Sequence, residues 1–151
     1  MKSKVPQGPA ARTSWYSVTS DSMSPALREG DTLETVPCRP EDLKRGDLVV
    51  FKRGAESICH RFLGRRSGHL YTQGDNLWHP DPPFPEDALE GKGIRLLRPG
   101  RSPTGVDGKA ARLRGIARIA LRRAKRRADR LLRRIFSVLC ELCVFAVSRF
   151  F

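Results

Sequence analysis

The chain has 151 residues and a mass of 17.0 kDa, which is enough for one domain with a hydrophobic core and appendages but hardly for two domains. Its 39% hydrophobic and 30% charged residues are close to globular usage and exclude wholesale disorder. The net charge of +13 is uneven, since residues 1–99 carry 15 Lys and Arg against 13 Asp and Glu, whereas residues 100–151 carry 14 against 3.

The first predicted segments are an N-terminal arm and a β-rich domain. Residues 1–14 are polar with Pro and Gly, so we expect a flexible arm, and they lack the apolar core of a secretory signal. Residues 15–99 alternate turn signals with short runs rich in β-branched and aromatic residues, which predicts strands. These runs are 15–20, 31–36, 47–53, 57–64, 69–73 and 94–99.

A Gly-Asp pair occurs three times in this domain, at 30–31, 46–47 and 74–75. Glycine accepts a positive φ and Asp hydrogen-bonds to the backbone that follows it, so each pair predicts a tight turn, the first two being architectural. Residues 79–93 contain four prolines and predict a rigid surface loop rather than a central strand. Residues 100–108 are typical of a linker, with Asp107 as a helix N-cap.

Residues 109–151 predict a basic amphipathic helix that continues into an apolar tail. Apolar residues recur at steps of three and four among Arg and Lys up to Arg134. The tail, 135–151, is marginal for spanning a bilayer, so an interfacial anchor is favoured. The expected partner is an anionic membrane surface rather than nucleic acid, because no aromatic residues accompany the basic run to stack on bases. The positive-inside rule then places the domain on the cytoplasmic side unless an upstream helix exists.

The four cysteines, Cys38, Cys59, Cys140 and Cys143, are too scattered for a disulfide framework. Cys140 and Cys143 form a C-x-x-C, but the surroundings are apolar and offer no second pair of ligands. We interpret these residues as structural, and expect no metal or other cofactor.

The candidate chemistry centres on Ser22 and His60. A serine hydroxyl is a poor nucleophile unless a base takes its proton. His60, in the predicted strand 57–64, is the best candidate for that base.

Five motifs occur in order around these residues: S-D-S-M-S-P at 20–25, R-E-G-D at 28–31, K-R-G-D-L-V-V-F at 44–51, C-H-R at 59–61 and Y-T-Q-G-D-N at 71–76. Together they resemble the signal peptidase family, most closely its archaeal and endoplasmic-reticulum-type branch, over about residues 17–97. The resemblance implies a β-rich catalytic domain of the signal-peptidase and LexA-like type. It also implies a serine endopeptidase that acts on a peptide or preprotein, cleaving signal or leader peptides after small residues.

The resemblance also implies roles for single residues. Ser22 matches the nucleophile, and His60 matches the histidine that replaces the lysine base of bacterial relatives. Asp81 matches the third member of the triad, and Ser20 matches the residue that helps to hold the oxyanion. Asp75 is expected to be structural, or an alternative third member.

The chain departs from the family pattern at three places. Asp21 stands where the family has Gly, which alters the geometry and charge of the turn at the nucleophile. His79 lies close to Asp81 in sequence and is a competing base or an exposed residue. No apolar helix precedes the first motif, so we expect the anchor at the C-terminal end instead.

Three other functions stay open. A LexA-type self-cleaving regulator would share the fold, but it needs a lysine base and a DNA-binding helix-turn-helix that the sequence does not display. A non-catalytic β domain could use its basic helix to bind anionic membrane or nucleic acid. A metal hydrolase built on His60, His69 and His79 lacks any recognised ligand spacing.

Overall fold

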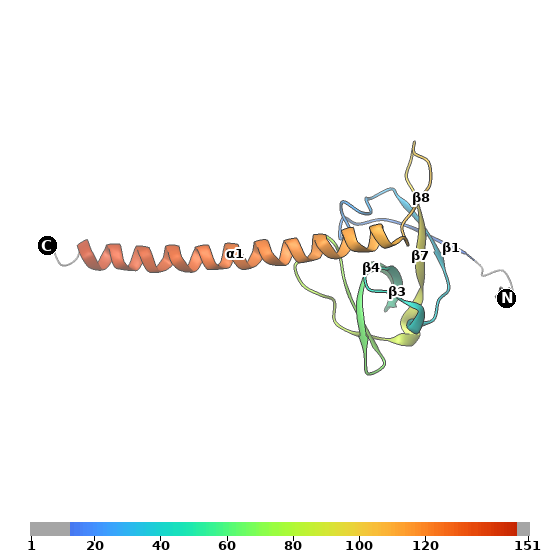
Figure 1. Cartoon of the computed structure of the whole chain (residues 1–151), viewed down its shortest axis with the longest axis horizontal. Coiled ribbons are helices and arrows are strands. Elements are labelled where there is room, and N and C mark those ends of the chain that lie inside the picture. Colours follow the sequence, from blue (N-terminus) through green and yellow to red (C-terminus); the bar gives the residue numbers. More distant parts are fainter. Residues whose placement is uncertain (1–12, 148–151) are drawn as a thin grey trace, which may run out of the picture. The chain divides into compact units, whose positions relative to one another are not determined.

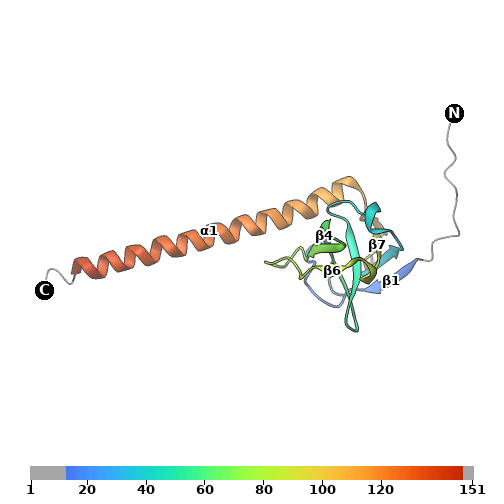
Figure 2. The ribbon, with the colours of Figure 1, turned by 90° about the horizontal axis from the view of Figure 1, so that it is seen from below.

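The computed structural model describes residues 13–147, with side chains described up to residue 137. Eight described strands form one antiparallel sheet in the order β1-β2-β7-β3-β4-β5-β6, with β8 also paired to β7. Figures 1 and 2 show strands of this sheet and the helix that follows them in the chain. The mainly β domain followed by a helix is therefore confirmed. The strands are β1 Ser14–Ser17, β2 Thr32–Val36, β3 Leu48–Arg53, β4 Glu56–Arg66, β5 His69–Gln73, β6 Phe84–Pro85, β7 Leu89–Leu97 and β8 Thr104–Gly105, and the helix is α1 Lys109–Val147.

Strand β3 lies at the centre of the domain, between β7 and β4. Successive side chains of a strand point to opposite faces. Accordingly, Leu48 and Val50 join one apolar cluster, and Val49 and Phe51 join a second. Burial on both faces explains the continuous apolar run L-V-V-F of β3. The adjacent strand β4, which carries His60, therefore also lies against the core.

The first two Gly-Asp pairs form the predicted tight turns. Gly30 and Gly46 have φ of +84° and +95°, a conformation that favours glycine. Asp31 Oδ2 accepts a hydrogen bond of 2.8 Å from the N–H of Arg28, and Asp47 Oδ2 accepts one of 2.8 Å from Lys44. Each carboxylate therefore closes its turn by binding the backbone three residues earlier, rather than the backbone that follows.

The proline-rich segment contributes more to the sheet than we expected. Phe84–Pro85 forms β6 on β5, a 3-10 turn spans Glu86–Ala88, and β7 begins at Leu89. The prediction of a surface loop up to residue 93 is wrong from Leu89 onwards, because the last proline of this segment is Pro85 and the chain beyond it can donate to a ladder.

The segment expected to be a linker also pairs with the sheet, since Thr104–Gly105 forms β8 beside Leu96 and Arg95. The chain divides into two compact units, and the boundary follows Ile119 within α1. In the first unit, Ile119 is 3% exposed and Gly115 is buried, so the first turns of α1 pack with the sheet domain. The sheet domain therefore extends beyond the linker that the sequence suggested.

No helix among the described residues combines the length and apolarity needed to cross a bilayer. The predictions for the apolar tail beyond residue 137, and for the side chains of Cys140 and Cys143, lie outside the described side chains. Cys38 and Cys59 are free thiols.

Candidate active site

The structure brings Ser22, His60 and Asp81 into one hydrogen-bonded chain. Ser22 lies in the loop after β1, His60 on β4, and Asp81 in the loop between β5 and β6. His60 Nδ1 is 2.7 Å from Asp81 Oδ2, and His60 Nε2 is 3.1 Å from Ser22 Oγ. An ionised carboxylate can only accept, so Nδ1 carries the proton and Nε2 is left to accept from the serine hydroxyl. His60 and Asp81 are 4% and 9% exposed, whereas Ser22 is half-buried and accessible.

The surroundings of Asp81 keep its carboxylate ionised. Thr72 Oγ1 donates a hydrogen bond of 2.7 Å to Asp81 Oδ2, and Arg53 Nη2 lies 3.7 Å from Asp81 Oδ1. Burial alone would raise the pKa of Asp81, but the hydrogen bonds from His60 and Thr72 and the nearby positive charges bring it below its ordinary value. The N–H of Asp81 also bonds to the carbonyl of Thr72 at 2.9 Å, which holds the proline-flanked loop against β5.

Asp75 lies in a different ion pair. Its two oxygens accept from Arg61 Nε at 2.7 Å and Arg61 Nη2 at 2.8 Å, while Arg61 Nη1 donates to the carbonyl of Gly46 at 2.7 Å. Both side chains are buried. Because His60 and Arg61 are consecutive on β4, their side chains point to opposite faces of the sheet. His60 contacts Ser22 on one face, and Arg61 contacts Asp75 on the other. Arg118 of α1 lies 3.6 Å from Asp75 Oδ2.

The loop that carries Asp75 also holds the Ser22 turn. The N–H of Asn76 donates to the carbonyl of Ser22 at 2.8 Å, and Asn76 Nδ2 donates to Asp21 Oδ2 at 3.2 Å. A Cβ on Gly74 would come within 2.6 Å of the Ser22 carbonyl oxygen, so close packing requires glycine there. The carboxylate of Asp21 thus has an amide partner.

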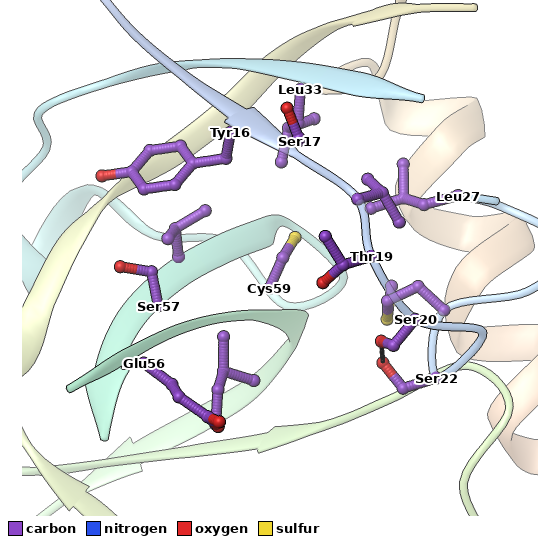
Figure 3. Close-up of a pocket in the computed structure, with 14 residues that line it drawn as sticks. Tyr16, Ser17, Thr19, Ser20, Ser22, Leu27, Leu33, Glu56, Ser57 and Cys59 are labelled. Carbon is purple, nitrogen blue, oxygen red and sulfur yellow. Dashed lines mark hydrogen bonds between the residues drawn. The ribbon is translucent and has the colours of Figure 1, made fainter. Parts of the chain in front are cut away.

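Ser20 is adjacent to Ser22, with 3.2 Å between their hydroxyl oxygens (Figure 3). Both serines line a pocket of about 450 Å³. Figure 3 shows the two serines at one end of this pocket and Glu56 at the other. Its walls come mainly from the segment 16–20 and from the start of β4, residues 56–59.

Both walls offer a strand edge. Strand β1 is at one end of the sheet order and pairs with β2. In β4, residues 56–61 pair with β3, whereas the pairing with β5 begins at Arg61. Backbone groups of these two edges can therefore pair with a further extended chain.

Two other sets of candidate metal ligands are the remaining histidines and Cys59. His69 and His79 are exposed, and His69 Nδ1 is 2.9 Å from the carbonyl oxygen of Ser67. No group of three or more His, Cys, Asp or Glu placed to hold a metal ion occurs in the described part of the chain. Cys59 lines the pocket, where burial raises the pKa of its thiol to about 12 and so keeps it protonated.

Sequence reasoning missed three residues of the site, Arg53, Thr72 and Asn76. Asn76 follows Gly-Asp directly in the fifth motif, so the motif contained a signal for it. Thr72 is the second residue of the same motif, whereas Arg53 carries no sequence signal, because its proximity to Asp81 arises from the strand that bears it.

The comparison with curated proteins found no match. A family model described as Peptidase S24-like matches residues 2–94. This family is of the serine peptidase type and includes both peptidases and LexA-type self-cleaving regulators. The matched segment contains Ser22, His60 and Asp81 and ends within β7. Since the match covers more than half of the 151 residues, the chain belongs to the Peptidase S24-like family.

Proposed function

We propose that this protein is a serine endopeptidase in which Ser22 is the nucleophile, His60 its general base and Asp81 the residue that orients the base. The observation that carries the proposal is the continuous contact from Ser22 Oγ to His60 at 3.1 Å and from His60 to Asp81 at 2.7 Å. A nucleophile, a base and an orienting group at hydrogen-bond distance are the requirements for activating a serine.

The reaction follows from these contacts. Ser22 Oγ attacks the peptide carbonyl carbon while its proton passes to His60 Nε2, and the Asp81 carboxylate stabilises the imidazolium that forms. His60 then gives this proton to the leaving amine as the C–N bond breaks. A water molecule, deprotonated by His60, hydrolyses the resulting ester on Ser22. The Ser20 hydroxyl and the backbone N–H of Ser22 are the proposed donors to the oxyanion.

The substrate we propose is an extended peptide segment, such as a signal or leader peptide, bound in the pocket beside Ser22. The free edges of β1 and of β4 residues 56–60 supply backbone hydrogen bonds to a chain lying between them. We propose a small side chain before the scissile bond, because this preference is implied by the resemblance to the histidine-dependent branch of signal peptidases.

A mixed-sequence peptide library analysed by mass spectrometry tests the proposal and identifies the cleaved bonds directly. The wild-type chain should cleave library peptides, and Ser22→Ala and His60→Ala should each abolish cleavage while leaving the circular dichroism spectrum unchanged. Matched controls are Ser24→Ala, two residues from Ser22, and His69→Ala, an exposed histidine. Cleavage that survives in either site variant would refute the dyad.

The same experiment separates the proposal from a LexA-type self-cleaving regulator, which the family also includes. Incubated alone, a self-cleaving chain loses its full length with a rate constant that is independent of protein concentration. An enzyme acting on other chains cleaves library peptides at a rate proportional to its concentration. Ser22-dependent self-cleavage without cleavage of added peptides would assign the regulator function instead.

A further inference from the structure

The second compact unit contains the greater part of the helix α1, and its side chains are described for residues 120–137. Residues three and four positions apart share one face of a helix. By this spacing, six of the eight apolar residues of the segment line up along α1, and we refer to these six as the apolar stripe. The stripe consists of Leu121, Ala124, Ala128, Leu131, Leu132 and Ile135.

The leucines of the apolar stripe are exposed to an unusual degree. Leu121 is 73% exposed, and Leu131 and Leu132 are 60% and 63% exposed. Single exposed apolar residues are ordinary, but a row of large ones along one helix face marks a surface that contacts an apolar environment.

The part of α1 in the first unit is packed against its own unit. Gly115 and Ile119 are buried there, whereas Leu113 is 60% exposed. In the second unit the leucines of the apolar stripe are exposed, although an amphipathic helix normally buries its apolar face against a core.

The remainder of this segment is strongly basic. Residues 120–137 contain eight Arg and Lys and one acidic residue, Asp129. The basic residues are Arg122, Arg123, Lys125, Arg126, Arg127, Arg130, Arg133 and Arg134. A basic face opposite an apolar face is the pattern of helices that lie in the headgroup region of anionic bilayers.

We propose that residues 120–137 of α1 bind the surface of an anionic membrane, with the apolar stripe in the acyl boundary and the arginines among lipid phosphates. Charge complementarity distinguishes this partner from a second copy, because pairing two stripes would bring two strongly positive helices together. The phosphates of a nucleic acid would attract the arginines, but the exposed leucines would remain in water. An anionic lipid surface offers phosphates to the basic face and acyl chains to the apolar stripe. Binding to this surface does not depend on the peptidase activity.

Vesicle sedimentation of the full chain tests this proposal. The wild type should sediment with vesicles containing about one third phosphatidylglycerol and stay in the supernatant with pure phosphatidylcholine vesicles. The triple substitution Leu121→Gln, Leu131→Gln, Leu132→Gln keeps the charge and removes apolar surface, and it should weaken partitioning by at least about tenfold. Trp15→Gln, which removes an exposed aromatic of the sheet domain, should leave partitioning unchanged.

A second set of variants separates the charge from the stripe. Arg127→Gln, Arg130→Gln and Arg134→Gln together should weaken partitioning and reduce its dependence on salt. Because all substituted positions are exposed, the variants should keep the wild-type circular dichroism spectrum. Partitioning of the leucine variant equal to that of the wild type would overturn the proposal. So would a wild-type chain that binds duplex DNA or RNA but not anionic vesicles, or one that dimerises through these leucines.

Discussion

At Gly115, a single added methyl group should disturb the domain strongly. A Cβ there would lie 2.1 Å from Arg61 Cζ, far inside van der Waals contact. A flexible arginine could normally move aside, but this guanidinium is held by two hydrogen bonds to Asp75 and one to the carbonyl of Gly46. Gly115→Ala must therefore displace either the helix or a buried, fully paired charge.

The size of the effect follows from opposing contributions. Replacing Gly by Ala within a helix normally stabilises by about 1 kcal/mol. Separating a buried ion pair costs about 3–5 kcal/mol, because the remaining charge has no compensation. Asp75 has no exposed side-chain surface, and Arg118, at 3.6 Å, would compensate its charge only in part, so its loss of Arg61 falls in this class. We expect Gly115→Ala to lower the free energy of unfolding by about 2–4 kcal/mol.

Urea unfolding followed by circular dichroism measures this change. Gly105→Ala is the matched control, because a Cβ at Gly105 meets nothing within 4 Å, and it should stay within about 0.5 kcal/mol of the wild type. A Gly115→Ala protein as stable as the wild type, or more stable, would refute the close packing of α1 on Arg61. If the variant folds, its peptidase activity should also fall, because the loop that bears Asp75 holds the Ser22 carbonyl through Asn76.

Three further predictions concern the triad, the acid stability and the domain boundary. Asp81→Asn should lower kcat by about 10³–10⁴-fold with little change in KM; steady-state kinetics showing less than a tenfold loss would count against its orienting role. Arg98→Gln should lower the free energy of unfolding at neutral pH, because the Arg98 hydrogen bond is the main cause of the lowered pKa of Asp31. The lowered pKa of Asp31 contributes stability that is complete above the pKa of the unfolded chain, about 3.9, and is lost as the pH falls through the pKa of the folded protein. The difference in urea stability between the wild type and the Arg98 variant should therefore shrink below about pH 4. A difference that stays constant with pH would contradict this prediction. A chain ending at Gly108 should be insoluble or unfolded, whereas a chain ending a few residues after Ile119 should unfold cooperatively. Equal stability of the two truncated chains would place the end of the sheet domain elsewhere.

Local chemistry made much of the fold predictable. The β-branched and aromatic runs became strands, and the pairs Gly30-Asp31 and Gly46-Asp47 became turns, because propensity and positive φ are properties of a few adjacent residues. The change to a three- and four-residue period likewise predicted α1. Short strands and boundaries were less predictable, since β6 and β8 contain two residues each and depend on a partner strand.

The candidate site was predictable as a set of residues but not as an arrangement. Order and spacing of the motifs singled out Ser22 and His60, and the resemblance favoured Asp81 as the third member while Asp75 stayed an alternative. The fold places Asp81 2.7 Å from His60 and gives Asp75 to Arg61, since consecutive residues of β4 face opposite sides.

The sequence by itself therefore determined the strands, the turns, the basic helix and the residue types of the site, which all depend on neighbours along the chain. Tertiary structure alone decided the partner of each aspartate and the extension of the sheet domain to Ile119. It also decided the need for glycine at position 115, where α1 meets Arg61. These features depend on contacts between residues far apart in sequence, whose distances follow from strand pairing and packing rather than from local preference.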